Sequence, residues 1–424
     1  MRQLRTAGLA IALLALAGLA TGCGSVPVAP AASGAQDAGA VVTSAGTGEA
    51  GAGIAGVGTA QAISVAAKER GAVLPAKPGA NVKHADLMFG VSCVGTPCIA
   101  VGGWYYGTKN GEHTLVEMWT GKAWVVEPSP YGPKDQALGA VSCAAGTPTA
   151  GCIALGTPTL AGYGSHWRVV TAPNGMNAVS CTSATTCLAV GALASLHAPV
   201  FATWNGTTWH KGTMHAAPPQ GQQVSVTIDG VSCTSANNCV AVGNYAYPLT
   251  AQPSPAYRDK TLAEQWNGHS WRLLPTVNVS HVNALAAVSC ASADTCTAVG
   301  TNQGQFPLAE RWNGSTWRVE SMPTVSTVGY VQLSGVSCPA ANFCVASGGY
   351  QTEPIAETWN GTKWRLTQLP EPPGGSTHGA QLSGVSCVSS RACVAVGTDY
   401  GIPGAFAERY AGGEWRLSAM RNPT

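Results

Sequence analysis

The motif Val-Ser-Cys recurs seven times along this chain, and in every copy a second cysteine follows the first after a few residues. Most copies are spaced by about 50 residues, and together they fill the chain from about residue 85 to its end. A repeated unit of this size buries its apolar surface by stacking against neighbouring copies. The seven pairs are Cys93 and Cys98, Cys143 and Cys152, Cys181 and Cys187, Cys233 and Cys239, Cys290 and Cys296, Cys338 and Cys344, and Cys387 and Cys393.

Each copy contains four candidate strands. After the Val-Ser-Cys strand come an apolar stretch such as CVAVG, a segment such as LAERW and a closing strand such as STWRVE. The dipeptide Asn-Gly, which readily adopts the positive φ angles of a hairpin turn, separates the last two strands in the copies that contain Asn205, Asn267, Asn313 and Asn360. The two tryptophans that flank this turn are expected to pair across the hairpin.

Four short antiparallel strands cannot cover their own apolar faces, and a stack that closes into a ring leaves no exposed ends. The sequence therefore predicts an all-β fold, a seven-bladed β-propeller with four antiparallel strands and one disulfide per blade. An open solenoid or two separate sandwiches are the alternatives. The second copy is the shortest: its third strand and turn are reduced to LAGYGSHW, although Trp167 and Arg168 still mark a closing strand.

The cysteine pairs are interpreted as disulfides because their short loops can link neighbouring strands at a separation that disulfide geometry tolerates. Zinc binding is the alternative, since paired cysteines can hold that metal. Each pair lies in a different copy, and no histidine recurs beside the pairs. The sequence accordingly predicts no metal site and no cofactor.

The N-terminal residues 1–23 have the parts of an export signal: Arg2 and Arg5, an apolar run from Leu9 to Ala20, and small residues before Cys23. The end of this segment resembles a bacterial lipobox, which implies lipidation of Cys23 and an anchor on the extracytoplasmic face of the cell membrane. Cys23 is also the single cysteine outside the seven pairs. The alternative is an ordinary cleaved signal and a secreted protein. Residues 24–80, rich in alanine and glycine, are predicted to be a disordered tether, and residues 81–424 the propeller.

The repeats resemble those of a large set of secreted actinobacterial proteins built from VSC, CVAVG and WNGxxW motifs, from about residue 85 onward. More distantly they are similar to the Asp-box propellers of sialidase-like proteins, through the glycine-centred turn of Asn313, Gly314 and Trp317. The second resemblance implies architecture alone, because asparagine directly precedes glycine where the Asp-box has aspartate and one intervening residue.

Several residues that suggest function have a structural explanation in this repeat. Twelve of the 13 tryptophans occupy the two hairpin positions, where packing would place them whatever the ligand. A glutamate recurs in the third strand of five copies, and in a ring these carboxylates lie on different blades, too far apart for joint acid–base catalysis. We therefore expect them to accept hydrogen bonds from the hairpin or a neighbouring blade; they are Glu117, Glu264, Glu310, Glu357 and Glu408.

Function is expected where the copies differ. In a propeller, the loops between second and third strands open on the same face as the connections between blades, and aromatic residues gather in or beside those loops here. Such residues could form a rim that binds glycans or peptides, or they could pack locally. The predicted rim comprises Trp104, Tyr105, Tyr106, Tyr245, Tyr247, Tyr257, Tyr350 and Tyr400.

The leading functional hypothesis is a cell-surface, lipid-anchored module that binds a glycan or protein ligand. A polysaccharide-active hydrolase or lyase and a structural envelope protein are the alternatives. The sequence contains no recognisable catalytic constellation, so enzymatic activity stays open. Basic and acidic residues number 22 and 20 and are scattered, which argues against nucleic acid as a partner. A monomer is expected.

Overall fold

A computed structural model describes residues 84–106, 112–131, 136–144, 151–193, 198–215, 225–248, 257–323, 330–351, 353–372, 379–400 and 404–421. All of them lie in the compact unit Ala67–Thr424. The predicted signal peptide, Cys23 and the tether lie outside the described residues. In the part that is described, no helix is long and apolar enough to cross a membrane.

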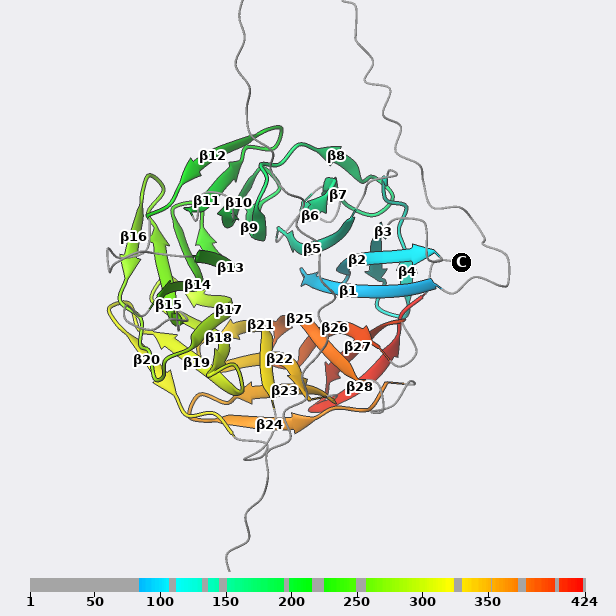
Figure 1. Ribbon diagram of the computed structural model, residues 1–424. Coiled ribbons are helices and arrows are strands. Elements are labelled where there is room, and N and C mark those ends of the chain that lie inside the picture. Colours follow the sequence, from blue (N-terminus) through cyan, green and yellow to red (C-terminus); the bar gives the residue numbers. More distant parts are fainter. Residues whose placement is uncertain are drawn as a thin grey trace, which may run out of the picture. The chain divides into compact units, whose positions relative to one another are not determined.

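The described strands form seven antiparallel sheets of four strands, each built from one continuous stretch of chain. Figure 1 shows these sheets as the blades of a ring, with the first strand of each blade innermost. The predicted seven-bladed propeller is therefore confirmed.

Blades 1 to 4 comprise β1 (His84–Cys93), β2 (Cys98–Tyr106), β3 (Glu112–Trp119) and β4 (Trp124–Val126); β5 (Gln136–Cys143), β6 (Cys152–Thr157), β7 (Thr159–Gly162) and β8 (Arg168–Val170); β9 (Met176–Ser183), β10 (Thr186–Leu193), β11 (Ala198–Trp204) and β12 (Trp209–Thr213); and β13 (Ser225–Ser235), β14 (Asn238–Pro248), β15 (Tyr257–Trp266) and β16 (Trp271–Leu274). Blades 5 to 7 comprise β17 (Asn283–Ser292), β18 (Thr295–Asn302), β19 (Phe306–Trp312) and β20 (Trp317–Glu320); β21 (Val331–Ala340), β22 (Phe343–Tyr350), β23 (Glu353–Trp359) and β24 (Trp364–Gln368); and β25 (Ala380–Ser389), β26 (Ala392–Asp399), β27 (Gly404–Ala411) and β28 (Glu414–Ala419).

The Asn-Gly hairpins form as predicted. In blade 5 the Asn313 side-chain oxygen accepts the backbone N–H groups of Ser315 and Thr316 at 3.0 and 2.9 Å. Gly314 has a φ of 91°, a conformation that glycine adopts without steric cost. Across this hairpin the rings of Trp312 and Trp317 lie 5.7 Å apart, which confirms the expected pairing.

The CVAVG motif requires its glycine for steric reasons. In blade 4 the register of β13 and β14 shifts between Ile228 and Gly230, which marks a bulge in the innermost strand. A Cβ atom at Gly243 in β14 would lie 2.0 Å from the carbonyl oxygen of Thr227. Only glycine therefore allows the two strands to pair beside the bulge.

The hydrophobic core is divided among the interfaces between blades. In one such cluster Val240 and Ala263 of blade 4 pack with Leu285 and Trp312 of blade 5. All seven cysteine pairs are disulfides, one in each blade, and they link the first two strands of that blade. The predicted disulfides are thus present in the fold.

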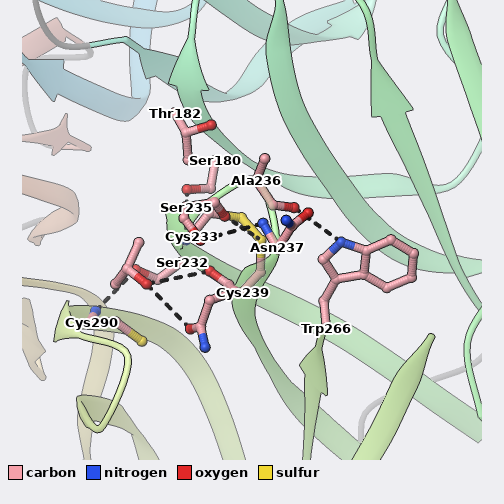
Figure 2. The surroundings of a disulfide bond; sticks show 12 residues. Ser180, Thr182, Ser232, Cys233, Ser235, Ala236, Asn237, Cys239, Trp266 and Cys290 are labelled. Carbon is pink, nitrogen blue, oxygen red and sulfur yellow. Dashed lines mark hydrogen bonds between the residues drawn. A yellow bond between two sulfur atoms is a disulfide. The ribbon is translucent and has the colours of Figure 1, made fainter. Parts of the chain in front are cut away.

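The serine of the Val-Ser-Cys motif joins successive blades. In Figure 2 the backbone N–H of Cys233 donates to the Ser180 hydroxyl of the previous blade, and that of Cys290 donates to Ser232, both at 3.0 Å. The bond recurs at all seven interfaces with lengths of 2.9 to 3.0 Å. The remaining five pairs are Cys93 and Ser386, Cys143 and Ser92, Cys181 and Ser142, Cys338 and Ser289, and Cys387 and Ser337.

The first and last blades meet by the same contacts as the others. Figure 1 shows β1 beside β25 and β26, and the Cys93 N–H reaches the Ser386 hydroxyl across this seam at 2.9 Å. Farther out, the Arg409 guanidinium of blade 7 lies 4.0 Å from the ring centre of Trp119 in blade 1. Among the described strands, neither end of the chain completes a sheet of the other end, so packing and hydrogen bonds close the ring.

Candidate functional site

The strand directions divide the surface of the propeller into two faces. Because the strands of a blade alternate in direction, the hairpins between first and second and between third and fourth strands share one face, which we call the hairpin face. The loops between second and third strands and the connections between blades share the opposite face, which we call the loop face. The predicted aromatic rim belongs to the loop face.

The structure buries two of the predicted rim residues. Trp104 is 4% exposed and Tyr245 is 7% exposed, so neither presents a ring face to a ligand. The Trp104 ring lies 4.7 Å from His113 and 6.4 Å from Tyr131 within blade 1. Trp104 breaks the tryptophan pattern of the repeat because it packs at the interface between blades 7 and 1, among Met88, Leu115 and other core residues.

The other predicted rim residues differ in exposure. Tyr400 is 55% exposed, whereas Tyr247 and Tyr350 are half-buried. Tyr247 stacks at 6.3 Å on Tyr245, and the Lys260 ammonium lies 5.4 Å from its ring centre. The backbones of Tyr105, Tyr106 and Tyr257 belong to β2 and β15, and their side chains lie outside the described part of the structure.

Sequence reasoning missed Tyr330, which precedes β21 and is 62% exposed, the highest value among the large apolar and aromatic side chains described as exposed. Its carbonyl oxygen accepts the backbone N–H of Gln351 at 2.9 Å, so Tyr330 and the loop after β22 form one corner of blade 6. The signal that could have found it is its place in a connection between blades, which opens on the loop face like the loops that contain the predicted tyrosines.

The same corner recurs in the two neighbouring blades. Gln303 of blade 5 donates its backbone N–H to the Val282 carbonyl at 2.7 Å, and Tyr400 of blade 7 donates to Gly379 at 2.8 Å. Gln303 and Gln351 have φ angles of 54° and 52°, which is uncommon for residues other than glycine. We call the exposed side chains of these corners the corner patch: Val282, Gln303, Tyr330, Gln351 and Tyr400.

The backbone bonds fix the corner patch to the rigid inner strands. Val331 also donates its N–H to the Gln305 carbonyl at 2.9 Å, which ties the corner of blade 5 to the start of blade 6. Tyrosine rings and glutamine amides combine flat apolar surface with hydrogen-bonding groups at the edge. The arrangement suits a ligand that offers both a ring face and hydroxyl or amide groups.

The central channel is lined by the bulged positions of the innermost strands. Asp229 is exposed in this channel, and the Asn177 amide donates to its carboxylate at 3.4 Å. Although Asp229 opens on the channel, desolvation by the surrounding strands raises the pKa of its carboxyl group, while hydrogen bonds from Thr227 and Asn177 lower it. The other bulged positions are Phe89, Gly139, Ala286, Ser334 and Ser383, so one side of the channel carries the single carboxylate.

The five recurrent glutamates are fully buried between blades. Three of them accept a backbone N–H from the end of the previous blade: Glu117 from Arg421 at 3.0 Å, Glu264 from His215 at 3.2 Å and Glu310 from Val277 at 3.3 Å. These bonds confirm for three glutamates the role expected from the sequence.

Burial raises the pKa of every one of these glutamates, because the charged form loses its hydration. The pKa rises to about 7 for Glu264 and Glu310 and to about 8 for Glu117, Glu357 and Glu408. Asp86, which is 2% exposed, has its pKa raised to about 7 for the same reason. The five glutamates are inaccessible to a substrate because their side chains are fully buried, so their role is structural.

No cluster of three or more histidine, cysteine, aspartate or glutamate side chains that could hold a metal occurs among the described residues. All of the cysteines that the structure describes form disulfides.

Comparisons with known proteins agree with the fold. No family model and no curated protein sequence matches this chain. The β-propeller domain of the Trilobed protease from Pyrococcus furiosus, described as having an open velcro topology, has a TM-score of 0.51 and 8% identity, and the match covers 81% of this chain and 98% of that chain. The six-bladed fucose-binding lectin of Aleuria aurantia has a TM-score of 0.45 and 9% identity, with 82% and 99% covered. At 8% identity the likeness to the protease domain shows the propeller fold alone.

Proposed function

We propose that this chain is an exported propeller that binds a glycan or protein ligand through the corner patch of its loop face. The observation that carries the proposal is the exposure of Tyr330 and Tyr400, at 62% and 55%, on corners held by backbone hydrogen bonds. Rigid tyrosines lose little conformational entropy when they are covered, which makes them effective contact residues.

The rest of the molecule supports a binding role by exclusion. The repeat explains the tryptophans, the disulfides and the buried glutamates as structural features. Among the described residues, the corner patch is a surface that the repeat does not explain, and its five side chains carry no charge and so offer neither a nucleophile nor an acid–base pair. This composition favours recognition over hydrolysis.

The experiment is a binding array of glycans, cell-wall fragments and exported proteins, probed with the full chain. We expect at least one class to bind, with about tenfold weaker binding after Tyr330→Ala or Tyr400→Ala. Val169→Ala and Val319→Ala remove exposed side chains from the outer strands and serve as controls. Binding that survives both tyrosine substitutions, or that falls equally in the controls, would refute the corner patch as the site.

We further propose that Cys23 is lipidated and anchors the protein at the extracytoplasmic face of the cell membrane. The support is the lipobox-like end of the N-terminal segment and the position of Cys23 outside the seven disulfide pairs. Mass spectrometry of membrane-extracted protein should show a diacylglycerol adduct at a new N-terminal Cys23. A secreted protein that starts beyond this residue would contradict the anchor.

A further inference from the structure

On the hairpin face, at the interface between blades 5 and 6, the Arg311 side chain of blade 5 contacts two groups of blade 6. The Arg311 guanidinium lies 4.5 Å from the ring centre of Trp359 in the next blade. Its Nη2 atom donates to the carbonyl oxygen of Ala341 in the disulfide hairpin of that blade at 2.9 Å. Arg409 of blade 7 lies over Trp119 of blade 1 in the same way, at 4.0 Å.

The interface between blades 2 and 3 lacks this arginine. The position of Arg311, which pairs with Thr297 and Arg318 across its sheet, is occupied in blade 2 by Ala161, which pairs with Ile153 and Arg168. The residue after Ala161 is also small, because Gly162 stands where five other blades have tryptophan and blade 7 has Tyr410.

A cavity of about 340 Å³ lies at this interface. Its walls include Trp204 and Ala184, which are the counterparts in blade 3 of Trp359 and Ala341 in blade 6. The cavity therefore contains the two elements that hold the Arg311 guanidinium elsewhere in the ring, an indole ring and the hairpin alanine. The other lining residues are Cys152, Ile153, Ala161, Gly162, His166, Arg168, Thr185 and Gly206.

We propose that this cavity binds a guanidinium group, presented as an arginine side chain by a partner polypeptide. The planar cation would stack on Trp204 and donate hydrogen bonds to the Ala184 carbonyl, as Arg311 does at its own interface. Lysine fits this site poorly, because its ammonium is a strongly hydrated point charge that cannot stack through a planar face.

Arg168 does not prevent this binding. The two filled interfaces also place a second arginine opposite the bound one, since Arg318 pairs with Arg311 and Arg416 with Arg409. Arg168 is exposed and loosely held: its guanidinium lies 5.7 Å from the Trp204 ring centre, and it donates to the Gly206 carbonyl at 3.4 Å. The proposal requires this side chain to leave the Trp204 ring when the partner's guanidinium binds.

This site is independent of the proposed function. It lies on the hairpin face, whereas the corner patch lies on the loop face, and it uses blades 2 and 3 rather than blades 5 to 7. Substitutions at one site leave the other intact, so either proposal can fail alone.

The test uses the full chain labelled with ¹⁵N at the tryptophan indoles, with the Trp204 resonance assigned from Trp204→Phe. The probe is the peptide acetyl-Gly-Arg-Gly-amide, and its neutral isostere contains citrulline in place of arginine. We expect the arginine peptide to shift the Trp204 resonance in a saturable manner and the citrulline peptide to bind at least about tenfold more weakly. An unchanged Trp204 resonance, or equal binding of the two peptides, overturns the proposal.

Three substitutions test the location of the site. Ala161→Arg supplies the arginine that blades 5 and 7 already have, so we expect a folded protein whose peptide binding falls at least about tenfold. Thr358→Arg makes the same kind of change at the interface of blades 6 and 7 and should leave binding unchanged. Arg311→Ala should create a second site, seen as a peptide-induced shift of the Trp359 resonance. Binding that persists in Ala161→Arg refutes the assignment.

Discussion

Each interface between blades has an inner layer beside the channel and an outer layer between the third strands, and the two layers differ in uniformity. In the inner layer, the hydrogen bond from cysteine N–H to serine hydroxyl occurs at all seven interfaces with lengths of 2.9 to 3.0 Å. In the outer layer, a buried glutamate occurs at five interfaces and accepts a backbone bond at three. The inner hydrogen bonds are therefore the same around the ring, whereas the outer contacts differ from one interface to the next.

The outer layer varies with one residue of the previous blade, six positions after its second hairpin tryptophan. At three interfaces this residue is His215, Val277 or Arg421, and its N–H donates to the glutamate. Before Glu357 and Glu408 it is Pro323 and Pro370, which have no N–H to donate. Both carboxyl oxygens of these two glutamates are buried, and neither has a hydrogen-bond partner among the residues that the structure describes.

A proline that faces a buried glutamate, and so gives it no hydrogen bond, is here called a mismatch. The two remaining interfaces also have a proline at the donor position but avoid this mismatch. Pro130 and Pro173 occupy the donor position there, and the glutamate is replaced by Leu160 in blade 2 and Ala202 in blade 3. A proline opposite an apolar side chain leaves no buried polar group unpaired. Blade 6 therefore differs from the others, because both of its interfaces combine a proline with a buried glutamate.

The largest expected effect is a loss of stability as the pH rises. Burial raises the pKa of Glu357 and Glu408 from 4.5 to about 8 in the folded chain, so between these values the folded chain holds protons that the unfolded chain has lost. The free energy of unfolding should then fall by about 1.4 kcal/mol per pH unit for each such group. Urea denaturation at pH 5, 6.5 and 8 measures this. A stability that rises across this window would contradict the assignment.

The same substitution should have opposite effects in the two kinds of interface. Glu357→Met replaces an unpaired buried carboxyl with an apolar side chain of similar size, as Leu160 does in blade 2, and should stabilise the protein at pH 8 by about 2 kcal/mol. Glu310→Met leaves the Val277 N–H without its acceptor, so this variant should stabilise the folded protein much less, or destabilise it. Thermal and urea unfolding of both variants at pH 8 would show this, and equal changes would mean that the backbone bond has no influence.

Restoring the donor should convert a mismatched interface into a matched one. Pro323→Ala supplies the N–H that Val277 supplies to Glu310, and the new bond outweighs the lost rigidity of proline, for a net gain of about 1 kcal/mol. The pH dependence should weaken at the same time, because a hydrogen bond to the carboxylate lowers its pKa. Pro130→Ala, opposite Leu160, is the matched control and should not stabilise. A gain in the control alone would contradict this explanation.

The repeat made the fold predictable, because seven cysteine pairs, Asn-Gly turns and paired tryptophans each specify local structure. The contacts between blades were harder to predict from the sequence. The serine of the motif pairs with a cysteine about 50 residues away, so local pattern gives no sign of its partner. The proline at the donor position of blade 5 and the glutamate of blade 6 become related only when the two blades are adjacent.

The site was predicted in part. The face that carries it follows from strand order, but the exposure of each aromatic residue depends on packing across blades. Trp104 stands in a variable stretch and yet is buried at the seam of the ring, where its ring meets that of Tyr131 edge-on. Tyr330 lies outside the loops that the sequence singled out, and a backbone bond to Gln351 brings it to the same corner.

The smallest expected effect tests whether the two layers act independently. Ser232→Ala removes the inner bond at the interface of blades 4 and 5, where Glu310 is paired, and should destabilise by about 1 kcal/mol. Ser337→Ala removes it at the interface of blades 6 and 7, where Glu408 is unpaired. Equal losses within about 0.5 kcal/mol at pH 5 would mean that the layers are additive. At pH 8, near the pKa of Glu408, about half of this carboxyl group is ionised. The loss in Ser337→Ala should then become the larger one if ionisation weakens the outer contacts and makes the interface depend more on the inner hydrogen bond. Ser165→Ala, at an exposed hairpin position, controls for the change of residue type. Losses that stay equal at both pH values would show that the inner ring holds each blade regardless of its outer layer.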